Sequence, residues 1–270
     1  MRLWPGSRRT TIPHVRLTGA IGMGSTLRPG LSLAGVESAL EKAFAIKGAP
    51  CVALSINSPG GAPAQTSLIF SRIRALSAEK NRPVVVFVED VAASGGYWLA
   101  LAGEEIFVDA TSIVGSIGVI FASFGFTELI AKVGVERRVY TAGRNKAVLD
   151  PFRPVEDKDV AILAAAQSDI HDAFVEVVRA RRGDRLGADE DLFTGAFWTG
   201  RRAVELGLVD GVGSLHQVMR ERYGEKVRIK PVPTHKPSLL RGRLGLAGGL
   251  TADSMIGALR ADSLHDRYGL

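Results

Sequence analysis

Cysteine is nearly absent from this chain of 270 residues, which has only Cys51. A single cysteine excludes an internal disulfide and any metal site built from several cysteines, so the fold needs no oxidising compartment. Cys51 begins the apolar run 51–56, where a buried structural thiol is the ordinary expectation. We therefore expect no metal and no cofactor.

Long apolar runs are also lacking. No stretch of about 18 or more apolar residues occurs, and the basic segment 1–10 has no apolar core of the length that a secretory signal requires. These two absences predict a chain without a transmembrane segment and a cytoplasmic location. The basic chain ends leave a peripheral membrane contact open.

The charge has no strong focus. Lys and Arg outnumber Asp and Glu by 34 to 28, which gives a formal net charge of +6. The basic clusters are separate and have no interleaved aromatic residues; they lie at 8–9, 137–138, 179–182 and 241–243. A nucleic-acid interface would need these charges on one face, so we expect a solvated basic surface and no nucleic-acid partner.

Strands and helices alternate in the first third of the chain. Apolar runs predict strands at 12–21, 52–56 and 84–88, and apolar residues at helical spacing predict helices at 33–44 and 64–79. This rhythm is typical of an α/β fold with a mainly parallel sheet flanked by helices. Further along, the patterns predict helices at 94–102, 128–133, 160–182, 201–206 and 215–223, and strands at 105–109, 116–121 and 137–141.

The domain organisation follows from composition. A hydrophobic fraction of 46% supports a core of its own, and we expect one domain at 1–230. Pro, Gly, Arg and His dominate the remainder, 231–270. We therefore predict a C-terminal tail that is peripheral or contacts a neighbouring subunit.

Ser94 follows the predicted buried strand, at the start of a helix, and two glycines come after it. The N-terminus of a helix directs unpaired N–H groups and positive potential at developing negative charge. Taken alone, this placement is better explained by an ordinary N-cap serine. The Asn-Ser-Pro-Gly-Gly segment at 57–61 follows the preceding strand in the same way, so a parallel sheet would bring it beside Ser94.

A base for a serine nucleophile is not evident from the histidines. His14, His216, His235 and His265 lie near the termini or on late elements, and His171 is in the middle of a predicted helix. Lys146, in a loop flanked by apolar residues, is an alternative if its ammonium group is desolvated. A solvated loop lysine is the simpler interpretation of the spacing.

Four segments together resemble the signal peptide peptidase A family: 57–61, 93–97, 115–119 and 143–146, in that family's order and approximate spacing. The resemblance covers about residues 12–213 and includes the later segments 193–203 and 205–210. It implies a ClpP/crotonase-like fold and a serine endopeptidase in which a lysine takes the proton of the serine. Its substrates would be peptides or unfolded polypeptides.

The resemblance also implies the site residues. By position, Ser94 would be the nucleophile and Lys146 the general base. Gly61 matches an oxyanion-hole position, Gly95 would be a second donor, and Ser116 resembles a position that orients the lysine ammonium. We expect the chain to depart from the family in having one module and no membrane anchor. In such a short form, the site is expected to need neighbouring subunits, so we expect a homo-oligomer in the shape of a ring or dome.

Alternative functions remain at this point. A crotonase-type enzyme would use the same fold to hold a CoA thioester and would need acidic residues such as Glu89 or Asp90 for proton transfer. An α/β-hydrolase elbow would require glycine in place of Ala92, and ClpP would require a histidine soon after Ser94. A catalytically silent scaffold of the same fold is the alternative outside the enzymes.

Overall fold

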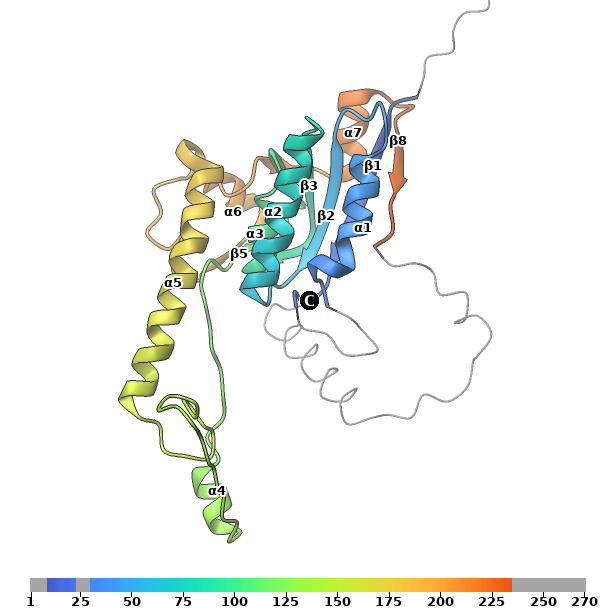
Figure 1. Cartoon of the computed structure of the whole chain (residues 1–270). Coiled ribbons are helices and arrows are strands. Elements are labelled where there is room, and N and C mark those ends of the chain that lie inside the picture. The colour runs from blue at the N-terminus through green and yellow to red at the C-terminus, as the bar shows by residue number, and fades with distance from the viewer. Residues whose placement is uncertain (1–8, 23–29, 235–270) are drawn as a thin grey trace, which may run out of the picture.

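A single sheet of eight strands is the centre of the part of the chain that the computed structural model describes, residues 9–22 and 30–234 (Figure 1). The main path through the sheet has the order β6-β5-β3-β2-β1-β8, and β4 lies between β3 and β7. Every pairing is parallel except that of β5 with β6, which confirms the mainly parallel sheet. The strands are β1 Thr11–Thr18, β2 Val52–Ser58, β3 Val84–Ala93, β4 Glu105–Val108, β5 Ile113–Gly115, β6 Phe197–Thr199, β7 Gly211–Val212 and β8 Arg228–Pro231.

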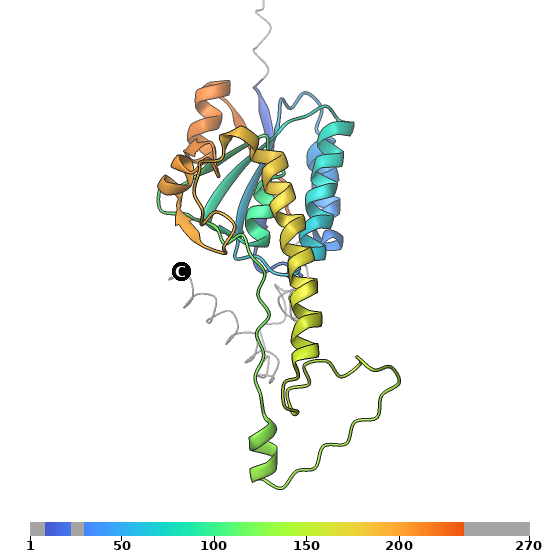
Figure 2. The same cartoon turned by 90° about the vertical axis from the view of Figure 1, so that its left-hand side faces the viewer.

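Helices cover both faces of this sheet. On one face, α1 (Leu33–Phe44) and α2 (Pro63–Glu79) pack with α3 (Gly95–Ala100) and the upper half of α5 (Asp157–Arg182) on the larger hydrophobic core (Figures 1 and 2). On the other face, α7 (Leu215–Tyr223) places Met219 in a smaller core with the buried residues Cys51 and Phe87. A short helix, α6 (Gly200–Glu205), follows β6. The expected α/β class is confirmed.

The segment between β5 and α5 leaves this body. We call residues 120–156 the arm; it runs beyond the carboxyl ends of the strands and carries α4 (Thr127–Lys132) at its far end (Figures 1 and 2). No residue of α4 is buried. The arm exposes large apolar side chains, among them Ile120, Phe121, Phe124, Leu129, Val133, Val135, Tyr140 and Val155. Such an apolar surface on a protruding segment is typical of a segment that contacts another protein surface.

Two predicted strands are wrong. Residues 116–121 and 137–141 form no strand, and β5 instead ends at Gly115. The apolar residues in these segments lie mostly on the exposed arm, where no neighbouring strand supplies hydrogen-bond partners. The short strands β6 and β8 were not predicted, because three or four residues give too little alternation to detect.

The predicted start of the tail falls inside the last strand. Pro231 ends β8, an edge strand where proline is tolerated, and Val232 is buried and donates its N–H to the His14 carbonyl at 2.8 Å. Residues 235–270 of the predicted tail lie outside the described residues.

Candidate active site

Ser94 forms the turn between β3 and α3. Its backbone has φ 51° and ψ −124°, a region that residues with a side chain seldom adopt, so the turn stores strain. The Ser94 N–H donates to the Gly115 carbonyl at 2.7 Å, and the Ser94 carbonyl accepts from Tyr97 and Trp98. The side chain makes no capping bond to the helix. The hydroxyl is therefore not used as an N-cap, and Ser94 is partly exposed while its neighbours at 91–100 are buried.

The 57–61 loop packs directly against this turn. A Cβ atom on Gly60 would lie 2.9 Å from Ser94 Cβ and 2.9 Å from the Gly95 nitrogen, so only glycine permits this approach. Gly96 is equally close to the 57–61 loop. A Cβ atom on Gly96 would lie 2.2 Å from the Ser58 carbonyl oxygen. The two loops that follow β2 and β3 are therefore side by side, as the parallel sheet predicts.

Two backbone N–H groups beside Ser94 have no acceptor among the described residues. Gly60 donates its N–H to Ser58 Oγ at 3.2 Å, whereas Gly61 has no such partner. In the parallel bridge to Ile21, the Gly60 carbonyl and the Ala62 N–H face Ile21, so the Gly61 N–H points to the opposite side, toward β3. Gly95 is the first residue of α3, where no intrahelical acceptor exists. Both N–H groups therefore lack an acceptor in the two loops that meet at Ser94.

Ser116 lies on the other side of Ser94. Ala93 and Gly115 are register partners in β3 and β5, so Ser94 and Ser116 follow neighbouring strand ends. Ser116 also has a positive φ of 52°, and its N–H donates to the Ala196 carbonyl at 2.7 Å. A side chain on Gly115 would meet the Trp198 ring at 2.7 Å, so β6 fixes this strand end from the far side.

Lys146 is not brought to Ser94 within the single chain. It lies in the arm, in the segment between α4 and α5, which both views place beyond the end of the sheet (Figures 1 and 2). Its side chain is exposed and makes no hydrogen bond or ion pair with any described residue, although its N–H donates to the Gly143 carbonyl at 3.3 Å. The predicted nucleophile, oxyanion donors and Ser116 thus converge, and the predicted base does not join them.

The acidic residues near Ser94 already have partners. Glu89 forms a two-pronged ion pair with Arg16, with its oxygens 2.8 and 2.9 Å from Arg16 Nε, and Asp90 Oδ2 accepts from Asn57 Nδ2 at 2.5 Å. Both carboxylates lie before the β3 turn, on the strand and not in the loop cluster. A crotonase-type proton transfer would need one of them at the reacting atoms, so this geometry weighs against that alternative.

The histidines do not supply a base either. His14 Nε2 lies 2.9 Å from Ser55 Oγ on the sheet, and burial lowers the pKa of His14 below its usual range. His171 lies on α5, and its Nε2 atom is buried with no hydrogen-bond partner among the described residues. Neither residue forms a hydrogen bond with Ser94. Among residues 9–22 and 30–234, no histidine therefore forms a hydrogen bond with the Ser94 hydroxyl.

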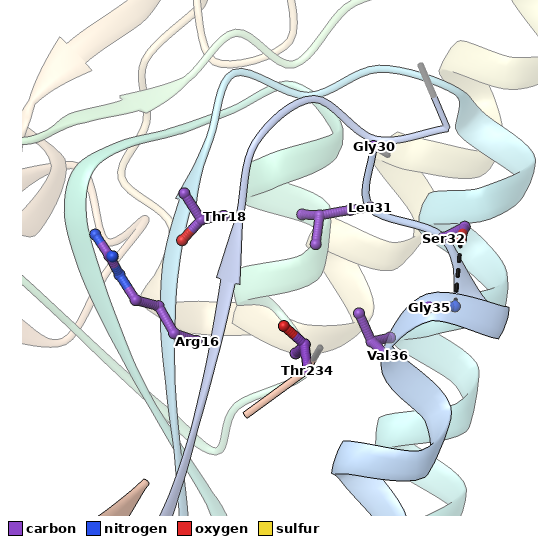
Figure 3. Close-up of a pocket in the computed structure, with 8 residues that line it drawn as sticks. All are labelled: Arg16, Thr18, Gly30, Leu31, Ser32, Gly35, Val36 and Thr234. Carbon is purple, nitrogen blue, oxygen red and sulfur yellow. Dashed lines mark hydrogen bonds between the residues drawn. The ribbon is translucent and has the colours of Figure 1, made fainter. Parts of the chain in front are cut away.

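A separate pocket lies at the start of α1, bounded by Arg16, Thr18, Leu31, Val36 and Thr234, with a volume of about 280 Å³ (Figure 3). Ser32 caps the helix there by accepting from the Gly35 N–H at 3.3 Å. Neither Ser94 nor the 57–61 loop lines this pocket. In residues 9–22 and 30–234, no group of three His, Cys, Asp or Glu side chains is arranged to hold a metal ion.

The sequence reasoning missed the side chain of Asn57. It joins β2 to β3 through hydrogen bonds to Asp90 and to the Val91 N–H, directly before the loop that carries Gly60 and Gly61. An amide side chain at the end of a strand, next to a Pro-Gly-Gly turn, was the available signal.

Comparison with known proteins gives the class. A protein of Brucella melitensis named Na(+)/H(+) antiporter NhaA is 55% identical over 258 residues, which are 94% of this chain and 35% of that protein. The Arabidopsis thaliana protein named serine protease SPPA, chloroplastic, is 28% identical over 217 residues, 78% of this chain and 32% of its own length. The chain thus spans about a third of the length of these relatives.

A solved structure shares the fold. A serine-to-alanine mutant of the 1510-N membrane-bound stomatin-specific protease matches with a TM-score of 0.53 and 14% identity, over 85% of this chain and 99% of that one. At this identity the similarity shows the α/β fold alone. The family model of peptidase family S49 matches residues 77–227, and the chain belongs to this family, that of the signal peptide peptidase A proteins.

Proposed function

We propose that this chain is a serine endopeptidase in which Ser94 Oγ attacks the carbonyl carbon of a peptide bond. Lys146 Nζ, as the neutral amine, takes the hydroxyl proton and passes it to the leaving amine nitrogen, so that an acyl-Ser94 ester remains. Water then attacks this ester, and its proton returns to Ser94 Oγ through the same lysine. The observation that carries the proposal is the strained turn that frees the Ser94 hydroxyl from capping.

The N–H groups of Gly61 and Gly95 would bind the oxygen of the tetrahedral intermediate. Support comes from their lack of other acceptors and from the contact of the 57–61 loop with Ser94. Donors that are already fixed in place stabilise the developing charge without reorganisation, which is where most of the rate gain of such a site arises. Ser116, at the neighbouring strand end, would accept a hydrogen bond from the lysine ammonium.

Lys146 would reach Ser94 from a second copy of the chain. The arm carries Lys146 away from its own Ser94 and exposes apolar side chains that a neighbouring copy would bury. The lower half of α5 adds to this surface, since Val160 and Ile162 are 45% and 41% exposed. A homo-oligomer, as a ring or dome, would thus complete each site and desolvate the lysine, which favours its neutral form.

The first test is labelling of the full chain with a fluorophosphonate probe. We expect one adduct, on Ser94, which Ser94→Ala removes, and loss of hydrolysis of an unfolded polypeptide in both Lys146→Ala and Lys146→Arg. Ser32→Ala is the matched control, because Ser32 caps α1 away from the site. A wild-type protein that neither takes up the probe nor hydrolyses polypeptide would favour the silent scaffold.

The second test separates pairing across subunits from pairing within one. We expect Ser94→Ala and Lys146→Ala each to be inactive; the two variants are mixed in equal amounts, unfolded together and refolded. If the dyad forms between neighbours, about a quarter of the sites receive an intact serine and an intact lysine, and activity returns. Activity that stays at zero while wild type treated in the same way recovers would refute the pairing between subunits.

The proposed substrates are peptides or unfolded polypeptides. The antiporter name of the Brucella relative concerns a protein nearly three times as long as the matched region. No helix in the described part of this chain is long and apolar enough to cross a membrane. The proposed peptidase chemistry concerns the region that the peptidase family S49 model matches, residues 77–227. A cytoplasmic location with peripheral membrane contact stays part of this proposal.

A further inference from the structure

An irregularity in β3 precedes Ser94 and affects the position of Ser94 relative to the 57–61 loop. Ile56 pairs with Val88 and Ser58 pairs with Ala92, so three residues of β3, 89–91, lie opposite the single residue Asn57 of β2. At the same place, β3 changes its neighbour on the other side: its residues 85–88 pair with β4 and 91–93 pair with β5. A bulge of this kind leaves the extra residues unpaired and bends the strand locally.

Asn57 occupies the gap that the bulge opens. Its Nδ2 donates to Asp90 Oδ2 at 2.5 Å, and its Oδ1 accepts from the Val91 N–H at 3.3 Å. Its own carbonyl accepts from the Gly19 N–H at 2.9 Å, which fixes Asn57 to the end of β1. The side chain thus replaces the ladder bonds that the extra residues interrupt.

A small displacement of the backbone at this bulge would move both Ser94 and the loop that carries Gly60 and Gly61. Asn57 is three residues before Gly60, and Val91 is three residues before Ser94. Gly60 and Ser94 are packed so closely that a single added Cβ atom would lie 2.9 Å from Ser94 Cβ. The distance from the nucleophile to the Gly61 donor is therefore set by how β2 and β3 are held together just before their ends.

We propose that Asn57 is a positioning residue, whose two side-chain hydrogen bonds hold the β3 bulge and so set the position of Ser94 relative to the oxyanion donors. This inference rests on the proposed function for its catalytic consequence, but not for its structural one. The amide is required because one end must accept from Val91 and the other must donate to Asp90. Asn57→Asp retains an acceptor and loses the donor, and it places two carboxylates face to face.

The experiment exchanges the Asn57 amide and the Asp90 carboxylate. Asn57→Ala and Asn57→Asp should each lower kcat about 100-fold and leave KM within about twofold, because the nucleophile moves while the substrate surface stays. In the double variant N57D/D90N, the carboxylate at 57 accepts from Val91 and from the new amide at 90. We expect this variant to recover most of the wild-type kcat, which a residue needed only for its size or polarity would not do.

Ser55→Ala is the matched control. Ser55 is buried on the same strand, two residues earlier, and its hydroxyl pairs with His14 and not with β3. We expect a lower unfolding temperature with kcat unchanged. Equal losses of kcat in Ser55→Ala and Asn57→Ala, or no recovery in the double variant, would overturn the proposal. If Asn57→Ala does not fold, Asn57→Asp and the double variant carry the comparison.

Crystal structures of wild type, Asn57→Asp and the double variant give a readout that does not need activity. The Ser94 Cβ to Gly60 Cα separation should increase in Asn57→Asp and return in the double variant. An unchanged separation would refute the positioning role. If the fluorophosphonate probe fails on wild type while this separation responds as expected, the proposed function fails and the role of Asn57 in holding the bulge stands.

Discussion

Individual backbone angles distinguish this site more sharply than its side chains do. Ser94 and Ser116 both have positive φ, and they follow the ends of two neighbouring parallel strands. Such angles cost free energy and persist only where the surroundings hold them, which is consistent with the proposed site. The supporting contacts come from glycines, since Gly60 and Gly115 leave room for Ser94 and for the Trp198 ring.

Gly60→Ala tests that constraint. Gly60 has φ 103°, and the added Cβ would approach the Ala93 carbonyl, the Gly95 nitrogen and Ser94 Cβ at 2.9 Å. We expect a loss of about 2 kcal/mol in the free energy of unfolding and a much slower reaction of Ser94 with the probe. Gly48→Ala also has a positive φ but open space around it, so it should lose stability and keep the labelling rate. Equal labelling of both variants would contradict the close contact at Gly60.

A second prediction at this scale concerns His14 and pH. Burial lowers the pKa of His14 in the folded chain, so the unfolded chain binds a proton more readily as the pH falls through about 6.5. The contribution of His14 to stability is therefore complete above that pH and declines below it. The free energy of unfolding, measured with a chemical denaturant, should fall less between pH 8 and pH 5.5 in His14→Gln than in wild type. An equal fall in both proteins would refute the effect.

At the scale of single elements, the two halves of α5 differ in burial. Its C-terminal half buries Phe174, Val178 and Arg182 against the body, and Phe174 stacks on Trp98 at 4.9 Å. Its N-terminal half projects with the arm, and the apolar residues Val160 and Ile162 on this half are exposed. Apolar side chains on a half that its own body does not cover are expected when a second copy of the chain covers them.

Polar substitutions on the arm test this interpretation. Phe124→Ser combined with Tyr140→Ser removes two side chains that are 78% and 91% exposed. We expect a smaller assembly by sedimentation and loss of Ser94 labelling, with an unfolding temperature of the single chain close to wild type. Leu68→Ser, on α2 and 48% exposed, is the control outside the arm and should leave the assembly intact. An unchanged assembly in the arm variant would refute the contact.

For the whole molecule, the candidate site is divided between two parts. The sheet body holds Ser94, Gly61, Gly95 and Ser116 at one edge, whereas the arm holds Lys146. If each site needs two chains, activity follows the assembly equilibrium and not the total amount of folded protein.

Dilution tests this division. We expect the labelling rate per chain to fall as the protein is diluted through the concentration at which sedimentation shows dissociation, because isolated chains lack a base near Ser94. Labelling that stays constant per chain below that concentration would show that one chain completes its own site. Circular dichroism at each concentration checks that the chain stays folded.

The sequence by itself determined the parallel α/β class, since strands and helices with strong periodicity, such as 33–44 and 84–88, depend on local patterns. It also placed Ser94 and the 57–61 loop at strand ends, and parallel strands necessarily bring such ends to one edge. Only the tertiary structure decided the remainder: the positive φ of Ser94 and Ser116, the β3 bulge held by Asn57, and the separation of Lys146 from Ser94. These features arise from contacts between residues far apart in the chain. The spacing of apolar residues also does not show whether a strand of the same chain or another copy of the chain covers them.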